Sequence, residues 1–251
     1  MPNEVASPTW KFVRFGLIVT GKGEYEFLDR FLRSLTSSGH CAFIVLARIG
    51  QLRPRTSPKH KLKIVGGKGS LPTQDEELGI YARGFINRGP NNFVLVIDDL
   101  EKGGRPMRED VYNRYRSALD GLLGDRAWKA AVFFLVNMLE AYYFAHARAV
   151  NEVLGTALED YSGDVEDIPH PKNQLKQLDS RFDEIQHGRQ IVEGLDLTQV
   201  LGRAETCRGL RSLFAWCRRV AGDPLDTTFR LANGEREPIT SIQVESLDGK
   251  V

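Results

Sequence analysis

The hydrophobic positions alternate between two patterns through the first 155 residues. Short continuous apolar runs are typical of strands buried on both faces of a parallel sheet. Each is followed by a segment in which apolar residues recur at the spacing of an amphipathic helix. The pattern predicts strands at 12–20, 41–49, 93–97 and 132–136, and helices at 24–35, 73–87 and 107–123. Thr73 and Glu76 have the spacing of a capping box at the start of the second of these helices. Strands that alternate with helices predict an α/β fold with a mainly parallel sheet flanked by helices.

The later part of the chain has a different pattern. An acidic segment with Gly and Pro predicts a loop at 160–171. Amphipathic spacing and an Asn-Gly turn predict helices at 172–185 and 205–220 and a hairpin at 227–244. We therefore expect a core at 1–155 and a mostly helical C-terminal extension at 156–251. The extension should end in this short hairpin and pack on the core as one unit.

Composition narrows the protein class. The three cysteines, Cys41, Cys207 and Cys217, are widely spaced and form no CxxC pair. This argues against a disulfide framework and a zinc site, and fits a reducing cytoplasm. The N-terminus lacks the pattern of a signal peptide, and the apolar stretch 130–145 is shorter than the roughly 20 residues of a membrane span. We expect a cytoplasmic protein with no membrane segment.

The net charge of +1 hides a strong segregation of charge. No acidic residue lies between Asp29 and Asp75, and the part at 51–61 is rich in proline and polar residues, which predicts a loop with exposed charge. Such a local positive field attracts phosphates. A solubilising loop, or a surface for an acidic protein partner, explains the pattern equally well. The candidate nucleic-acid-binding residues are Arg48, Arg53, Arg55, Lys59, Lys61 and Lys63.

The most distinctive polar feature is the tetrad Asp98-Asp99-Leu100-Glu101, which follows directly on the apolar run 93–97. Ligand sites in parallel sheets lie just outside the carboxyl ends of the strands. Three carboxylates placed there repel one another unless a cation or basic groups offset the charge. Oxygen ligands of this kind suit Mg²⁺. An acidic turn at a solvated sheet edge is the alternative.

Glu140 is the second candidate, because it closely follows the strand predicted at 132–136. A structural explanation competes with a catalytic one. Asn137 could cap a helix, with Glu140 at the third helical position completing a capping box. Both explanations remain open. Upstream, Gly21-Lys22-Gly23 forms a predicted turn before a helix whose N-terminus would suit an anion, although the spacing of a P-loop is absent.

Four short motifs together resemble the Toprim-like DUF4276 family, which is akin to the Toprim domains of OLD-type nucleases. The resemblance spans roughly residues 12 to 215, and its specificity comes from the order and spacing of the motifs. It implies a compact α/β domain with an acidic Mg²⁺-binding or Mn²⁺-binding centre that cuts or joins phosphodiester bonds. The motifs are Val19–Glu24, Asp98–Glu101, Leu139–Ala145 and Pro171-Lys172.

The chain departs from the family pattern at one position. The first strand of the family ends in a Glu thought to act as general acid or base, and Thr20 stands there in this sequence. A threonine hydroxyl cannot take up a proton near neutral pH. Either Glu24, which matches a second Glu of the family, substitutes for it, or the strand-cutting chemistry is absent. Glu101 stands where an Asp is usual.

The resemblance implies metal-assisted phosphodiester hydrolysis, with Glu24, Asp98 and Lys172 as catalytic residues. It also implies a role in bacterial phage defence beside an ABC-type or AAA-type ATPase partner, with nucleic acid as the substrate. The rival hypothesis is a catalytically silent Toprim-like module that binds a protein partner or nucleic acid. The implied metal ligands are Glu24, Asp98, Asp99, Glu101 and Glu140.

Overall fold

A computed structural model of the chain describes residues 12–37, 39–51, 73–100, 108–137 and 139–222. Four strands form one sheet, and every pairing within it is parallel. The strands are β1 (Val13–Val19), β2 (Cys41–Arg48), β3 (Asn92–Leu100) and β4 (Ala130–Val136), in the order β2-β1-β3-β4. The predicted α/β class with a parallel sheet is confirmed.

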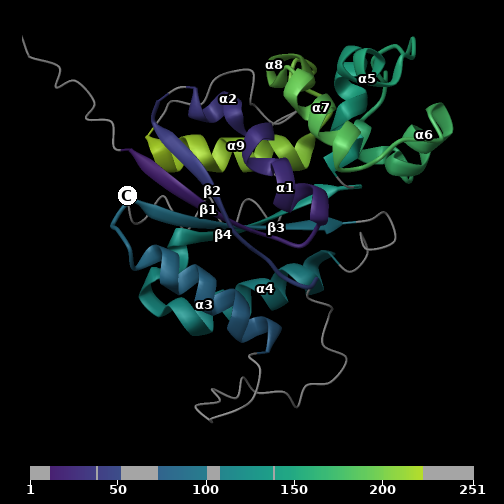
Figure 1. Cartoon of the computed structure of the whole chain (residues 1–251). Helices are drawn as coiled ribbons and strands as arrows, with labels where there is room; N and C mark the ends of the chain where they lie inside the picture. Colours follow the sequence, from purple (N-terminus) through teal and green to yellow (C-terminus); the bar gives the residue numbers. More distant parts are fainter. Residues whose placement is uncertain (1–11, 38, 52–72, 101–107, 138, 223–251) are drawn as a thin grey trace, which may run out of the picture.

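Helices cover both faces of this sheet (Figure 1). One face carries α1 (Lys22–Phe31), α2 (Arg33–Thr36) and α9 (Arg208–Ala221), and the other carries α3 (Gln74–Ile86) and α4 (Arg108–Leu123). The C-terminal part is mostly helical, as predicted. Beyond β4 and before α9 the chain forms η3 (Leu139–His146), α5 (Ala147–Leu154), η4 (Val165–Asp167), α6 (Pro171–Leu178), α7 (Gln186–Gly194) and α8 (Leu197–Val200), and a further 3₁₀ helix, η2 (Gly124–Lys129), precedes β4.

The strand order creates a topological switch point between β1 and β3. The chain leaves β1 through α1 and α2 toward β2, at one side of the sheet. It leaves β3 through α4 toward β4, at the opposite side. Connections that diverge in this way leave a crevice outside the carboxyl ends of the two strands, where open α/β sheets bind ligands. Thr20 and Asp98 lie at these ends.

The strands bury side chains on both faces, and this produces two hydrophobic clusters. Phe15 and Leu17 of β1 belong to the larger cluster, which includes α1, α9 and residues of the C-terminal part. Ile18 faces the smaller cluster under α3 and α4. The larger cluster therefore joins residues from both sides of the predicted boundary at 155/156. No helix in the described part of the chain is long and apolar enough to cross a membrane.

Several predicted element boundaries differ from the structure, and the helix predicted at 24–35 is divided into α1 and α2. Two further differences have a physical explanation. β3 continues to Leu100 instead of ending at Ile97, because Asp98 and Asp99 pair with Phe134 and Leu135 of β4. These carboxylates therefore lie within the strand and not in a turn after it. β3 also extends past the end of β1, so its last residues have a neighbouring strand on one side only.

The single helix predicted at 172–185 is also wrong, because α6 ends at Leu178 and α7 begins at Gln186. Asp179 accepts a hydrogen bond from the backbone N–H of Arg181, and Asp183 accepts two from Ile185 and Gln186. Such local side-chain bonds compete with helical backbone bonds. By contrast, the predicted capping box of Thr73 and Glu76 is present at the start of α3. The hairpin predicted at 227–244 lies outside the described residues.

Candidate active site

Asp98 and Thr20 join the ends of β3 and β1 at the switch point. The carboxylate of Asp98 is fully buried and accepts hydrogen bonds from Thr20 Oγ1 at 2.7 Å and Tyr115 Oη at 2.9 Å. Gln51 Nε2 donates a third bond at 3.1 Å. Burial raises the pKa of Asp98, and these hydrogen bonds oppose that shift. Both oxygens of Asp98 are therefore already engaged by protein donors.

Glu24 lies in the first turn of α1 and is also buried, with 4% of its surface exposed. Its side chain folds back over Gly21, so that a Cβ at position 21 would lie 1.7 Å from Glu24 Oε2. Burial raises the pKa of Glu24, and hydrogen bonds from its own backbone and that of Leu139 oppose the shift. The charges of Glu184 and Asp98 raise it further. Gly21 thus leaves the space that the Glu24 carboxylate occupies.

Glu140 lies in the first turn of η3 and is as buried as Glu24. Burial raises its pKa to about 7, and the negative charges of Glu24 and Glu184 add to the shift. The capping-box explanation for Glu140 is wrong. Asn137 has a left-handed φ of 58°, its Nδ2 donates to the carbonyl of Glu166 at 2.7 Å, and the helix begins only at Leu139.

Lys172 provides positive charge beside these carboxylates. It lies in the first turn of α6 and forms an ion pair with Glu184, in the segment between α6 and α7. Burial acts to lower the pKa of Lys172, but the bond and charge of Glu184, with the charges of Glu140 and Glu24, raise it overall. Lys172 therefore stays protonated and partly offsets the buried negative charge.

The structure brings three predicted site residues, Glu24, Glu140 and Lys172, into one acidic centre. Asp98 is close enough to Glu24 to affect its pKa, yet it is held by a separate set of partners. Asp99 is half-buried, and its carbonyl accepts a bond from Gln51 at 2.9 Å. Arg48, at the end of β2, is exposed. The predicted residues Glu101, Arg53, Arg55, Lys59, Lys61 and Lys63 lie outside the described part of the chain.

Sequence reasoning missed several members of the site. Glu184 has no motif around it, and its role follows only from the fold of the segment between α6 and α7. Tyr143 is fully buried, and its pKa is raised well above its ordinary value by burial and by the charges of Glu140 and Glu24. Tyr115, which donates a hydrogen bond to Asp98, was missed as well. The available signal was its polar hydroxyl group on the apolar face of the helix predicted at 107–123.

The carboxylate oxygens of the acidic centre suit a hard cation, but they are too few to surround a metal ion completely. Within the described residues, no group of three or more His, Cys, Asp or Glu side chains is arranged to hold a metal ion. Mg²⁺ commonly binds through one or two carboxylates and completes its shell with water and substrate phosphate. Glu24 and Glu140, two mutually repelling buried carboxylates, fit that open kind of site.

Comparison of the chain with protein-family models, with curated proteins and with solved structures found no match. The Toprim-like resemblance therefore depends on its motifs alone. The fold and the acidic centre are the features from which function is argued.

Proposed function

We propose that the protein is a Mg²⁺-dependent or Mn²⁺-dependent phosphodiester hydrolase of Toprim type. One observation carries the proposal: Glu24 and Glu140 are both buried, burial raises the pKa of both carboxyl groups, and the charge of Glu24 raises the pKa of Glu140 further. Buried like charges destabilise the fold unless a bound ligand of opposite charge offsets them. Strongly shifted pKa values cluster at functional sites for this reason.

The residues of the acidic centre suggest distinct roles. Glu140 has a pKa of about 7 in the metal-free centre and would release its proton when it binds the ion. Lys172 would offset charge on the phosphoryl group in the transition state. Thr20 and Tyr115 would hold Asp98 in place. Glu24 and Glu140 would hold the divalent ion, which when bound would supply a Lewis acid and an activated water for phosphodiester hydrolysis.

The proposed setting is bacterial phage defence in the cytoplasm. Nucleic acid, either DNA or RNA, would be the substrate, and the exposed Arg48 beside the switch point would contact its phosphates. An ABC-type or AAA-type ATPase would be the partner that licenses cutting. These parts of the proposal depend on the motif resemblance and on the charge segregation of the sequence.

Cleavage of labelled single-stranded and double-stranded DNA and RNA, with Mg²⁺ or Mn²⁺ and with EDTA, tests the proposal. We expect divalent-ion-dependent cleavage that falls by about 100-fold or more in Glu140→Gln and Glu24→Gln. Glutamine keeps the shape of the side chain and removes its charge and its proton exchange. Calorimetric titration with Mn²⁺ should show binding to the wild type that both variants lose.

The matched control is Glu152→Gln, which changes an exposed glutamate of α5 that pairs with Arg148. It should cleave and bind Mn²⁺ like the wild type. Far-UV circular dichroism must show that each variant is folded. The proposal fails if the folded wild type shows no ion-dependent cleavage of any of the four substrates, or if Glu140→Gln cleaves as fast as the wild type.

A catalytically silent binding module is the second candidate, and the bonding of Asp98 favours it. Asp98 is fully buried, and three protein groups already occupy its oxygens. A ligand to Asp98 would have to displace these bonds. Nucleic-acid or protein binding that persists in Glu140→Gln, with no cleavage by the wild type, would support this function.

A further inference from the structure

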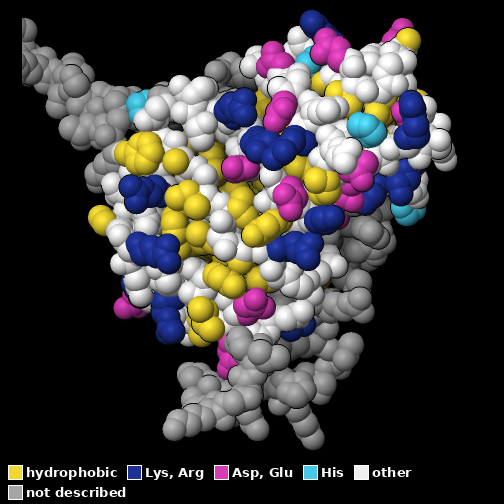
Figure 2. Space-filling model, viewed as in Figure 1, with side chains coloured by type: hydrophobic (Ala, Val, Ile, Leu, Met, Phe, Trp, Pro, Cys, Tyr) yellow, Lys and Arg dark blue, Asp and Glu magenta, His cyan; other side chains and the backbone are white. Residues whose placement is uncertain are grey.

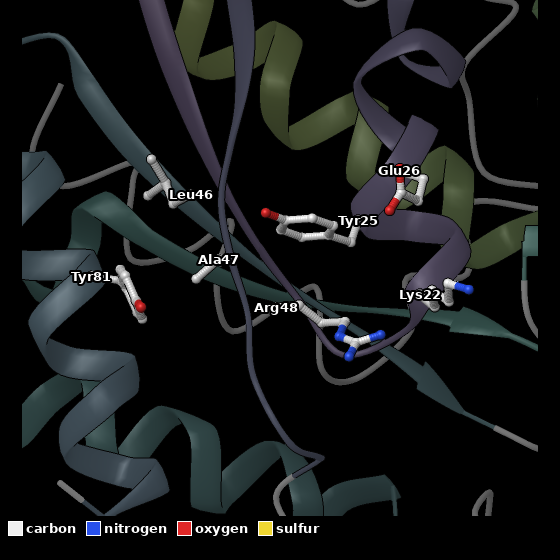
Figure 3. Close-up of a pocket in the computed structure, with 7 residues that line it drawn as sticks. All are labelled: Lys22, Tyr25, Glu26, Leu46, Ala47, Arg48 and Tyr81. Atoms are coloured by element: carbon white, nitrogen blue, oxygen red, sulfur yellow. The ribbon is translucent and has the colours of Figure 1, made fainter. Parts of the chain in front are cut away.

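The open edge of the sheet carries a pocket that the acidic centre does not use. β2 is at the end of the strand order and, in the described sheet, pairs with β1 alone. A hollow of about 440 Å³ lies across β2 between α1 and α3 (Figure 3). We call it the edge pocket. It is lined by Lys22, Tyr25, Glu26, Leu46, Ala47, Arg48 and Tyr81.

The edge pocket offers exposed aromatic surface. Tyr25 and Tyr81 are 46% and 37% exposed, although both have large apolar rings. Figure 3 shows Tyr25 reaching from α1 toward β2 and Tyr81 on α3 at the other side of that strand. Figure 2 shows hydrophobic side chains gathered over this part of the molecule, bordered by Lys and Arg. Exposed aromatic rings of this kind are platforms on which a planar group can stack.

The charge of the edge pocket favours an anionic ligand. Lys22 and Arg48 contribute two positive charges against the single negative charge of Glu26. Arg48 is exposed and forms no ion pair with any residue that the structure describes. Lys22 adds less to the positive charge of the pocket than Arg48 does, because the negative charge of Asp183 lies near it. An exposed guanidinium beside an aromatic ring matches a phosphate attached to a base.

The edge pocket lies at the same end of the sheet as the acidic centre. Lys22 begins α1, and Glu24 follows in the same turn but on the buried side of the helix. Arg48 pairs in register with Val19, the residue before Thr20. A chain bound in the pocket would therefore continue toward the carboxyl ends of β1 and β3.

The edge of β2 is poorly suited to an added peptide strand. Leu17 pairs with Val45 and Ile18 pairs with Ala47, so Leu46 is an extra residue that interrupts the ladder. Such a bulge twists an edge strand and blunts pairing with another chain. The side chain of Leu46 covers Gly16, where a Cβ would lie 2.5 Å from Leu46 Cδ1. A ligand recognised by stacking and charge therefore fits better than one recognised by backbone pairing.

We propose that the edge pocket binds an unpaired nucleotide of single-stranded nucleic acid, with its base on Tyr25 and its phosphate on Arg48. Tyr81 provides a second stacking surface for a neighbouring base. In a duplex the faces of the bases are stacked on one another, so they are inaccessible to both tyrosines. The inference deepens the proposed hydrolase function, because it names single-stranded nucleic acid as the substrate class.

Fluorescence anisotropy with a labelled single-stranded oligonucleotide tests the proposal. The measurement is made with the full chain in EDTA, so that binding is observed without cleavage. Tyr25→Ala should weaken binding by roughly 5-fold to 100-fold, the effect of losing one stacked base, whereas Tyr25→Phe should retain wild-type affinity. Arg48→Gln should weaken binding and reduce the dependence on salt by about one phosphate contact.

The control is Tyr161→Ala, which removes a tyrosine of similar exposure that does not line the edge pocket. This variant should bind the single strand like the wild type. A matched duplex should bind to the wild type and to all variants with much lower affinity. The proposal is overturned if the wild type does not bind the single strand, if it binds the duplex as tightly, or if Tyr25→Ala binds unchanged. A dimer in solution that Tyr25→Ala converts to a monomer also overturns it, because the pocket would then be an interface.

The outcomes separate this inference from the proposed hydrolase. Glu140→Gln should keep wild-type binding while it loses cleavage. Binding that depends on Tyr25, without cleavage by the wild type, would leave the edge pocket as proposed and reject the hydrolase. Cleavage that depends on Glu140 but not on Tyr25, with unchanged binding in Tyr25→Ala, would reject the edge pocket and leave the hydrolase as proposed.

Discussion

At the scale of single residues, the acidic centre holds more negative charge than the surrounding protein offsets. Glu24 and Glu140 are each 4% exposed, and burial is the largest cause of the raised pKa of each. Lys172 already forms an ion pair with Glu184, so its single positive charge only partly offsets the charges of Glu24 and Glu140. The ionised centre is therefore a source of instability that a cation would relieve.

The stability of the protein should depend on pH through Glu140. Its pKa rises from 4.5 in the unfolded chain to about 7 in the fold, so its contribution is fully present below about pH 4.5 and is lost as pH rises toward 7. The loss is on the order of 3 kcal/mol of unfolding free energy. Urea unfolding at about pH 5 and about pH 8 should show this fall in the wild type and a smaller fall in Glu140→Gln.

Glu152→Gln again provides the comparison, since that exposed side chain should leave the pH dependence unchanged. Equal pH dependence in Glu140→Gln and the wild type would show that Glu140 does not titrate as described. Addition of Mn²⁺ at the higher pH should restore stability to the wild type but not to Glu140→Gln, if the ion binds at this centre.

At the scale of elements, close approach between helices depends on glycine. α3 and α4 pack together on one face of the sheet, and Gly79 of α3 lies against Leu122 of α4. A Cβ at position 79 would lie 2.1 Å from Leu122 Cδ1 and 2.9 Å from its Cβ. Because the contact involves atoms near the backbone of α4, a rotation of the Leu122 side chain alone cannot relieve it.

Gly79→Ala should therefore destabilise the protein by about 1–3 kcal/mol, through overpacking between α3 and α4. Gly84 is the matched control within the same helix, because no atom lies within 4 Å of the position of its Cβ. Gly84→Ala should stabilise by about 0.5–1 kcal/mol, since alanine loses less backbone entropy in a helix. Thermal unfolding of both variants measures the difference, and equal effects would contradict the packing explanation.

At the scale of the whole molecule, the C-terminal part completes the core of the sheet. Trp216 of α9 is almost fully buried, and its ring centre lies 5.9 Å from that of Phe15, 6.2 Å from that of Phe93 and 6.0 Å from that of Phe133. These three rings belong to β1, β3 and β4. One side chain of α9 therefore contacts most of the sheet.

Trp216→Ala should destabilise the whole protein by about 3–5 kcal/mol, because it leaves a large cavity between α9 and the sheet. Sheet and C-terminal helices should unfold together in a single transition, seen equally by circular dichroism and by calorimetry. Leu178→Ala, at a 37% exposed position of α6, should have little effect. Two separate transitions in the wild type would show that the C-terminal part folds independently.

Local sequence patterns predicted most of the elements and some of their ends. Continuous apolar runs indicated all four strands of the described sheet, and Thr73 with Glu76 indicated the start of α3. These patterns succeed because they depend on neighbours within a few residues. The motifs also selected Glu24, Glu140 and Lys172, which the fold brings into one centre.

Tertiary structure decided what those residues contact. Pairing with β4 carries β3 through Asp98 and Asp99, and no pattern near the tetrad contains that information. Glu184 meets Lys172 only because local bonds at Asp179 and Asp183 separate α6 from α7. The sequence by itself therefore determined the parallel α/β elements and the acidic side chains at their ends. Their burial and mutual repulsion arise from packing between segments far apart in the chain, and only the folded structure sets these.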